Sequence, residues 1–423
     1  METILLGVGV ILLLLVFSIP IGVSIGLGVL AALFAAGQPP ALFIQKWYNS
    51  FDSFPMMAIP FFLLAGEIMA RGTLSQTLLN WCNSLLGHRR GGLANISVVT
   101  SLFYGALSGS AIATTAAVGG IMIPEMEREC YPVDFACAVT ATSGSLAVLI
   151  PPSIPLIVYG SFGGLPVSDL FLAGIIPGIF MAVAIMLTSY VIIRRNNYGH
   201  LYKKASWATR WKTFKAAAPA LGVPVIILGG IYGGIFTPTE AGVVAVVYAL
   251  FVECFISRSM TGPLFIHICK STLNSLGLIF FVVIPASALG TLLQYYNFQD
   301  IISQFLLGIS DNHYVFLFVM TLVYLVLGCF LEVVVAVMIL APLLVPLSIS
   351  YGFDPVHFAI FTIVALCIGL VTPPVGGDLF VACSIGKVEI LKLSKRCVPF
   401  ILTLIGATLI IGLVPQLSTL LVR

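Results

Sequence analysis

The sequence predicts an all-α polytopic membrane protein, on the strength of three observations. Of its 423 residues, 60% are hydrophobic and 8% are charged, whereas a soluble globular chain carries about 25% charged residues. Apolar runs of about 20 residues recur from end to end, each long enough to cross a hydrocarbon layer about 30 Å thick as a helix. These runs are continuous rather than alternating, which favours helices over a transmembrane barrel. The composition therefore argues against a soluble enzyme, a nucleic-acid-binding protein and a disordered scaffold, and makes the lipid bilayer the expected surroundings.

The apolar runs define the elements in chain order. We expect membrane segments near residues 4–36, 54–70, 93–123, 135–160, 170–193, 216–236, 239–257, 273–293, 315–345, 358–386 and 397–421. The first run has no basic residues before it and is predicted to be a retained helix rather than a cleaved signal. Its Pro20 predicts one kinked helix or two short ones, so the helix count and the side of the N-terminus stay open. The nine cysteines are scattered without a CxxC pair, which predicts neither a disulfide framework nor a metal site.

The two halves of the chain share landmarks at a nearly constant separation, which predicts an internal repeat. We expect a first repeat over residues 1–215 and a second over 216–423. The landmarks recur 222 to 225 residues apart, pairing Pro60 with Pro285, Gly105 with Gly328, Phe135 with Phe358, and Pro151-Pro152 with Pro373-Pro374.

Basic residues predict that the two repeats are inverted. Segment 87–91 contains two arginines, but its counterpart 309–313 contains no Lys or Arg. Conversely, 161–169 has no basic residue, whereas 387–396 has four. The connector 194–215 carries seven basic residues and no acid, so we place it in the cytoplasm. A cytoplasmic location for 71–90, 194–215, 258–270 and 387–396 places 16 of the 19 Lys and Arg on that side.

Pro-Pro pairs interrupt two of the apolar runs. Such a pair removes amide donors and disfavours a helical conformation in the residue before it. In lipid the freed carbonyls must be buried in protein or face a polar cavity. We therefore predict re-entrant helical hairpins near 135–160 and 358–386, each with its tip near mid-membrane. A kinked spanning helix is the alternative for each run.

Polar residues near these breaks are the candidate site. Two hairpin tips facing two broken helices match the way secondary transporters bind cargo at the membrane midplane. Unwound carbonyls and hydroxyls there suit a dehydrated sodium ion, although small residues also simply permit close helix packing. The predicted ion ligands are Ser108, Gly109, Ser110 and Ser145 in the first half, and Gly328, Glu332, Gly369, Thr372 and Gly376 in the second.

A second group of residues is predicted to bind substrate. Ionisable groups deep in apolar runs are costly and are usually functional, so Glu332 or Asp378 is expected to bind a cation, a proton or a substrate hydroxyl. A threonine hydroxyl bonded to its own helix is an equal alternative to a cavity-lining one. The predicted substrate residues are Thr114, Thr115, Ser153 and Asp378.

Other chemistry has little support in the sequence. The Gly386-Lys387 pair lacks the spaced glycine of a phosphate-binding loop, and no Ser/His/Asp grouping suggests an enzyme. No Lys or Arg lies within an apolar run. An anionic cargo would therefore be neutralised by helix N-termini, backbone amides and bound cations. Coupling sodium ions are expected, and no other cofactor.

At these residues the chain resembles the large membrane (M) subunit, DctM-like, of tripartite ATP-independent periplasmic (TRAP) transporters. The likeness covers nearly the whole chain, and its most specific motifs are IPFFLLAG at 59–66, GALSGSA at 105–111, GSLAVLIPPSIPLIVY at 144–159, TPTEA at 237–241 and GLVTPPVG at 369–376. Three positions depart from the family pattern: Glu332 often corresponds to Asp, Ala365 to Asn, and Gly377-Asp378 to an Asn-like pattern.

The resemblance implies a function. Family members import organic acids, commonly C4-dicarboxylates, keto-acids or sialic acid, by sodium symport across the bacterial inner membrane. An elevator mechanism is implied, in which a transport domain built from both hairpins slides against a scaffold. A small four-helix Q membrane subunit, here a separate chain, and an extracytoplasmic substrate-binding protein are the implied partners. The alternatives are a proton-coupled carboxylate carrier and an anion channel without a binding protein. The sequence leaves open the organic acid, the number of sodium ions and the oligomeric state.

Overall fold

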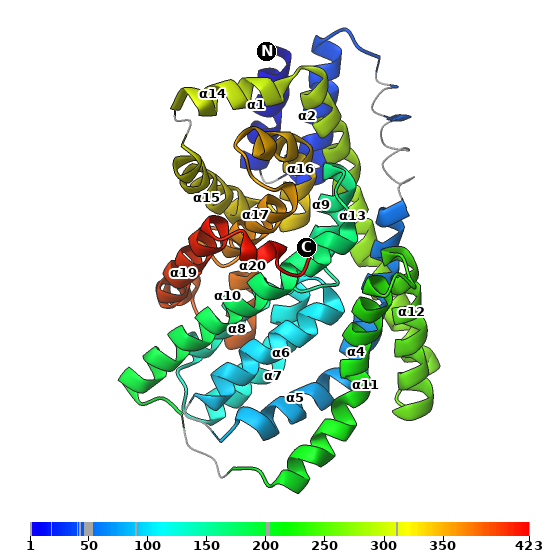
Figure 1. The fold of residues 1–423 in the computed structure, drawn as a ribbon, viewed down its shortest axis with the longest axis vertical. Helices are drawn as coiled ribbons and strands as arrows, with labels where there is room; N and C mark the ends of the chain where they lie inside the picture. The colour runs from blue at the N-terminus through cyan, green and yellow to red at the C-terminus, as the bar shows by residue number, and fades with distance from the viewer. Residues whose placement is uncertain are drawn as a thin grey trace.

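The computed structural model describes residues 2–17, 19–39, 41, 44–45, 54–88, 91–199, 204–309 and 312–422, and every regular element in this part of the chain is helical (Figure 1). Eight of the described helical segments are long and apolar enough to cross a membrane. The all-α prediction is therefore confirmed. Residues 200–203 of the basic connector lie outside the described ranges.

The first half of the chain runs from α1 to α10. Its elements are α1 (Glu2–Val16), α2 (Ile21–Ala35), η1 (Phe54–Met57), α4 (Ala58–Arg71), α5 (Leu74–Leu86), α6 (Gly92–Ser108), α7 (Ala111–Arg128), α8 (Val133–Gly144), η2 (Ser145–Val148), α9 (Ile154–Gly163) and α10 (Val167–Asn196). The first apolar run is thus two helices rather than one kinked helix. Pro20, which begins α2 as its N-cap, separates them.

The second half runs from α11 to α20. Its elements are α11 (Trp207–Tyr232), α12 (Pro238–Phe251), η3 (Val252–Ile256), α13 (Gly262–Tyr295), α14 (Phe298–Ile309), α15 (His313–Phe330), α16 (Val333–Ser350), α17 (Pro355–Gly369), α18 (Gly377–Gly386), α19 (Ile390–Leu413) and α20 (Gln416–Thr419). Helices α5 to α10 begin 221 to 224 residues before α14 to α19, in the same order. The landmark spacing of the sequence thus corresponds to matching helix boundaries.

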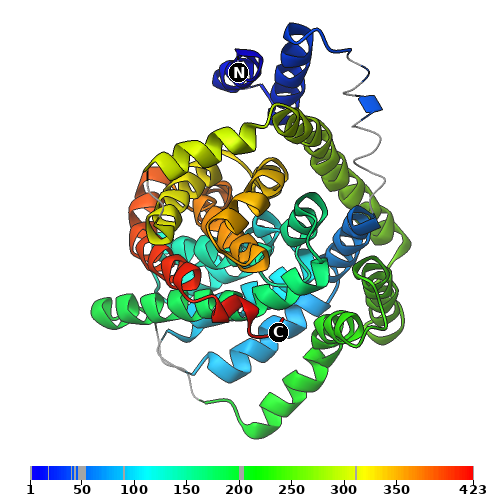
Figure 2. The ribbon, with the colours of Figure 1, turned by 45° about the horizontal axis from the view of Figure 1, so that its top comes forward.

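The helices form an outer arc and a central body. Along the arc, each helix packs against the next in the order α1, α2, α13, α4, α12, α11 and α5. Figure 2 shows this arc along one edge of the molecule, with α1 and α2 at its end. The central body contains α6 to α10 and α15 to α20. Most of the buried apolar side chains form one continuous core, and a smaller cluster joins α1 and α2 to α13 and α16.

Two apolar runs break in the middle of the central body. The run 93–123 ends α6 at Ser108 and resumes as α7, because Gly109 adopts φ +60° and Ser110 caps the new helix. The Ser110 hydroxyl accepts a hydrogen bond from the Ala113 amide at 3.4 Å. In the run 315–345, Glu332 performs the same task for α16 by accepting from the Val334 amide at 3.0 Å. Both breaks fall where capping side chains satisfy the new helix's first amides.

Each Pro-Pro pair lies in a turn between two short helices. The first turn joins η2 to α9, the second joins α17 to α18, and both Pro-Pro peptide bonds are cis. The second helix of each pair packs across the molecule: α9 contacts α16 and α17, and α18 contacts α7 and α8. The two halves are therefore interleaved in the central body rather than packed as separate units.

Helix α19 contacts a helix on the N-terminal side of each Pro-Pro turn. It contacts α8, which precedes the first turn, near one end, and α17, which precedes the second turn, near the other. Near its N-terminal end, the Arg396 guanidinium lies 3.5 Å from the Asp134 carboxylate at the start of α8 and donates to the Tyr198 hydroxyl at 3.1 Å. At the other end, the Gly412 carbonyl lies 3.2 Å from Nε2 of His357 at the start of α17. Nδ1 of the same buried histidine lies 2.6 Å from the Ser418 hydroxyl in α20. The helices that precede the two turns are thus attached to one helix.

Candidate ion and substrate site

A cavity of about 330 Å³ lies between the outer arc and the central body. Helices α4 and α13 line one side, and the break between α6 and α7, the start of α9 and the start of α16 line the other. Among the described lining residues, the charged ones are both acidic, Glu67 and Glu332, and the polar ones are Tyr104, Ser108, Ser110 and Ser275. The cavity is otherwise apolar, as small-molecule sites usually are.

The first helix break approaches the tip of the first Pro-Pro turn. A Cβ added to Gly109 would lie 3.2 Å from both the Pro152 carbonyl oxygen and the Ile154 amide nitrogen. The hydroxyls of Ser108 and Thr114 are 2.9 Å apart across the break. The left-handed conformation and the close approach both favour glycine at position 109. Carbonyl and hydroxyl oxygens from two elements consequently converge there, and such oxygens are the ligands that hard cations prefer.

The second helix break approaches the second turn in the same way. A Cβ on Gly328 would lie 2.5 Å from the Leu366 carbonyl oxygen and 3.0 Å from Cα of Gly369. The Cys329 thiol donates to the Pro373 carbonyl at 3.6 Å. In the turn itself, Gly376 adopts φ +37°, and a Cβ there would lie 3.1 Å from the Thr372 carbonyl oxygen. The turn is therefore tightly curled around its own carbonyl groups.

The predicted ion ligands thus lie in two groups. The structure brings together Ser108, Gly109 and Ser110 at the first break, and Gly328 and Gly369 at the second. Ser145 lies in η2, which packs on α6 and α7, and its hydroxyl donates to the Thr142 carbonyl at 3.0 Å. The Thr372 hydroxyl donates to the Ile368 carbonyl at 2.7 Å. These two hydroxyls already have partners within their own elements, so their roles as ion ligands stay predictions.

The predicted substrate residues are all fully buried, at 0% exposure, and none lines the cavity. The Thr114 hydroxyl is bonded to Ser108, and the Ser153 hydroxyl donates to the Val148 carbonyl. Thr115 and Asp378 lie next to each other. Their side-chain oxygens have no hydrogen-bond partner among the described residues. Contact of these four residues with substrate therefore remains a prediction from the sequence.

Glu332 lies at the junction of two cavities. The second cavity, of about 290 Å³, runs between α2, α13 and α16 and is lined by apolar side chains together with Glu332. Both cavities share Leu278, Ile279 and Val334 as well. The helix break thus presents a carboxylate to both spaces while using one of its oxygens to cap α16.

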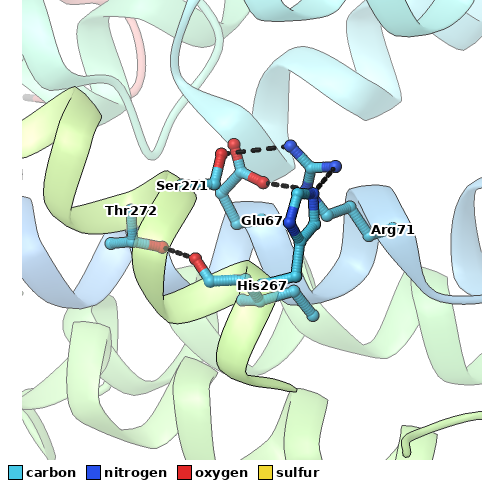
Figure 3. Close-up of polar contacts among 6 residues, drawn as sticks. Glu67, Arg71, His267, Ser271 and Thr272 are labelled. Carbon is cyan, nitrogen blue, oxygen red and sulfur yellow. Dashed lines mark hydrogen bonds and ion pairs between the residues drawn. The ribbon is translucent and has the colours of Figure 1, made fainter. Parts of the chain in front are cut away.

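Sequence reasoning missed part of the cavity wall. Glu67 precedes Arg71 by four residues, a spacing that by itself indicates a helical ion pair. That pair is present, with Arg71 Nε 2.6 Å from Glu67 Oε2, but Glu67 also lines the cavity. Tyr104 and Ser275 were not singled out. Figure 3 shows Arg71 reaching from α4 to α13, where it contacts His267 Nε2 at 3.0 Å and the Ser271 hydroxyl at 3.0 Å. The packing of α4 against α13 brings Glu67 and Ser275 into the same wall.

Comparison with known proteins identifies the family. The model of the "Tripartite ATP-independent periplasmic transporter, DctM component" matches residues 8–417. The chain belongs to the DctM family of TRAP transporters. The resemblance noted in the sequence is therefore confirmed. As a DctM-family permease with eight membrane-length apolar helices among its described residues, the chain is a multi-pass protein of the bacterial inner membrane.

Individual relatives of this DctM-family chain transport different compounds, according to their names. The isethionate TRAP transporter permease DctMQ of Oleidesulfovibrio alaskensis is 37% identical over 96% of this chain, which spans 64% of that longer protein. The sialic acid TRAP transporter large permease SiaM of Vibrio cholerae is 35% identical, with 96% of each chain aligned. The C4-dicarboxylate large permease DctM of Rhodobacter capsulatus is 33% identical over 97% of this chain and 96% of its own.

A solved structure shares the fold. The crystal structure of the Alcanivorax borkumensis YdaH transporter, described as having an unusual topology, superposes with a TM-score of 0.61. The alignment covers 88% of this chain and 87% of that one at 16% sequence identity. This similarity concerns the arrangement of helices alone.

Proposed function

We propose that the chain is the transport subunit of a sodium-coupled importer of an organic acid. Related permeases are named for isethionate, sialic acid, C4-dicarboxylates and 2,3-diketo-L-gulonate. These compounds are all small organic anions, although the individual substrates differ widely. The substrate class proposed here is accordingly a small organic acid with one or more acid groups.

One observation carries the coupling proposal: the charged residues described in the cavity wall are two glutamates. An organic anion entering this cavity would meet like charges, which repel in a low-dielectric interior. Cations bound at the two breaks would reverse that repulsion. The oxygens around Gly109 and in the curled turn after Thr372 are suitable ligands for sodium, which enters here as a co-transported ion.

The remaining features of the proposal are supported by the repeated helix order, the distribution of basic residues and membership of the TRAP family. We propose that residues 1–215 and 216–423 are inverted repeats, and that the two Pro-Pro turns are tips of re-entrant hairpins. In an elevator mechanism, the central body would be the moving domain. The outer arc, formed by α1, α2, α13, α4, α12, α11 and α5, would be the scaffold. A separate Q membrane subunit and an extracytoplasmic substrate-binding protein would complete the transporter.

Reconstitution into proteoliposomes tests this function. The chain, its Q subunit and its binding protein are combined and offered labelled isethionate, sialic acid, succinate and 2,3-diketo-L-gulonate in separate assays. We expect uptake of at least one acid that requires both an inward sodium gradient and the binding protein. Equal uptake with an imposed potential but no sodium would contradict sodium coupling. Uptake without the binding protein, accompanied by single-channel currents, would instead support an anion channel.

A further inference from the structure

Arg71 forms a polar cluster beside the cavity wall, between α4 and α13. Its guanidinium binds Glu67, His267 and Ser271 (Figure 3). The preceding turn of α4 supplies Glu67 and Ala70 to the cavity wall, and α13 supplies Ser275 one turn after Ser271. The side chains of Arg71 and Glu67 are 38% and 22% exposed, whereas Ser108 at the first break is buried. The cluster therefore joins the cavity wall, through Glu67, to partly exposed polar groups on α4 and α13.

The cluster has capacity to bind an anion. A guanidinium carries five N–H donors and no acceptor, and the three contacts with Glu67, His267 and Ser271 use one donor each of Nε, Nη1 and Nη2. His267 must accept at Nε2, because arginine offers only donors. Within the described part of the chain, two N–H groups of Arg71 are not used by these three contacts. Carboxylate and sulfonate groups match the planar fork of arginine.

Charge gives Glu67 and Arg71 opposite roles toward an organic anion. Glu67 resembles the cargo in bearing a carboxylate, and it already occupies Nε of Arg71 at 2.6 Å. An acid group arriving at the cluster would compete with Glu67 for the same guanidinium. The distribution of basic residues predicts that 71–90 and 258–270 face the cytoplasm, which places both Arg71 and His267 on the exit side for import.

We propose that Arg71 is an anion-contact residue, which receives the acid group of the cargo on the cytoplasmic side of the cavity in exchange for Glu67. The inference rests on the proposed organic-acid transport. It adds an exit site that α4 and α13 build together, five residues along α4 from Gly66, which packs against the end of α6 beside the first break. Ser271 and His267 position the guanidinium.

The test uses the complete transporter in proteoliposomes under an inward sodium gradient, with whichever of the four acids named above the unchanged protein imports. We expect Arg71→Gln to lower the maximal uptake rate about tenfold, as for loss of a charge-assisted contact. The concentration of loaded binding protein at half-maximal rate should stay unchanged, because delivery occurs on the other side. Arg71→Lys should retain part of the rate. Arg128→Gln is the matched control, since Arg128 forms an exposed pair with Glu125 on α7, 3.5 Å apart.

A double variant distinguishes binding of the cargo by Arg71 from simple neutralisation of the Glu67 charge by Arg71. If Arg71 binds the cargo, Glu67→Gln/Arg71→Gln should remain as slow as Arg71→Gln. Full recovery in the double variant would overturn the proposal, because Arg71 would then serve only to neutralise Glu67. Unchanged uptake by Arg71→Gln would overturn it as well.

Inhibition of uptake by acid inside the vesicles distinguishes the proposed role from a folding defect. The single variant Glu67→Gln removes the competitor and leaves the contacts of Arg71 with α13 intact. Acid trapped inside the vesicles should then inhibit uptake at a concentration several-fold lower than for the unchanged protein. No shift in this concentration would contradict the proposal. If the unchanged protein imports none of the four acids, both the proposed function and this inference fail. If it imports one of them normally and the Arg71 and Glu67 variants behave as the unchanged protein does, only this inference fails.

Discussion

Gly328 of α15 and Gly369 at the end of α17 meet backbone to backbone. A Cβ added to Gly369 would lie 2.2 Å from the carbonyl carbon of Gly328. The same crossing occurs 223 and 222 residues earlier, where a Cβ on Gly105 would lie 2.6 Å from Cα of Ala147. Each broken helix thus contacts the adjoining Pro-Pro turn element through a site with no room for an added methyl group. The second crossing is the tighter of the two, since both of its residues are glycines.

Gly328→Ala is expected to disrupt this crossing. The added methyl group must displace the backbone of α17, at a cost of about 1–3 kcal/mol, so the thermal unfolding temperature and the transport rate should both fall. Gly277→Ala is the control, because a Cβ there has no neighbour within 4 Å and alanine favours a helix more than glycine does. Equal unfolding temperatures for the two variants in detergent would contradict the packing argument.

Ser108→Ala and Thr372→Ala test the predicted ion ligands. Removal of a hydroxyl ligand should weaken sodium binding, so the sodium concentration for half-maximal uptake should rise several-fold, with about 1–2 kcal/mol lost per contact. Ser384→Ala is a matched control, since the Ser384 hydroxyl donates to the carbonyl four residues earlier at 2.9 Å, as that of Thr372 does. Sodium titrations that coincide for all three variants and the unchanged protein would remove Ser108 and Thr372 from the ion sites.

Glu253 is expected to be important for stability although it lies outside the cavity. This buried carboxylate in η3 accepts from the amides of Thr73 at 2.8 Å and Leu74 at 3.1 Å, and so caps the start of α5 from another helix. Glu253→Ala should cost about 2–3 kcal/mol, because one buried and one partly buried amide lose a charged acceptor. Glu389→Ala provides the comparison, since Glu389 begins α19 without a side-chain capping bond. A thermal shift assay should therefore separate the two variants, and similar unfolding temperatures would show that the buried cap contributes little.

Asp378→Asn should raise the unfolding temperature. The Thr115 hydroxyl lies beside this fully buried carboxylate but does not form a hydrogen bond of ordinary geometry with it, and a poorly paired acid in an apolar interior is costly. A neutral side chain of the same shape reduces that cost by about 1 kcal/mol or more. Transport assays of the same variant test the predicted substrate role: an unaltered half-saturating substrate concentration would place Asp378 outside the substrate site. A lower unfolding temperature would show that the carboxylate is stabilised in the fold.

The local features of the fold were predictable, but their spatial combination was not. Pro-Pro pairs and the Ser-Gly-Ser segment carry strong local signals, and the structure places turns at the former and a helix break at Gly109. The capping role of Glu332 has a weaker signal, since an acid in an apolar run also suggests a ligand. The burial of Thr115 and Asp378 depends on α18 packing against α7, which joins residues more than 250 positions apart in the sequence. Likewise, Glu67 became a cavity residue only because α13 lies beside α4.

The two attachments of α19 have a mechanical consequence. Arg396 of α19 contacts the start of α8, and Gly412 of α19, together with Ser418 of the following α20, contacts the start of α17. A displacement of α8 should therefore be transmitted through α19 to α17. The two Pro-Pro tips consequently cannot shift independently without breaking a buried histidine contact or a partly buried ion pair. If the central body moves as proposed and ions bind at both tips, an ion missing from either tip should restrain the whole central body, so partial loading should not give partial movement.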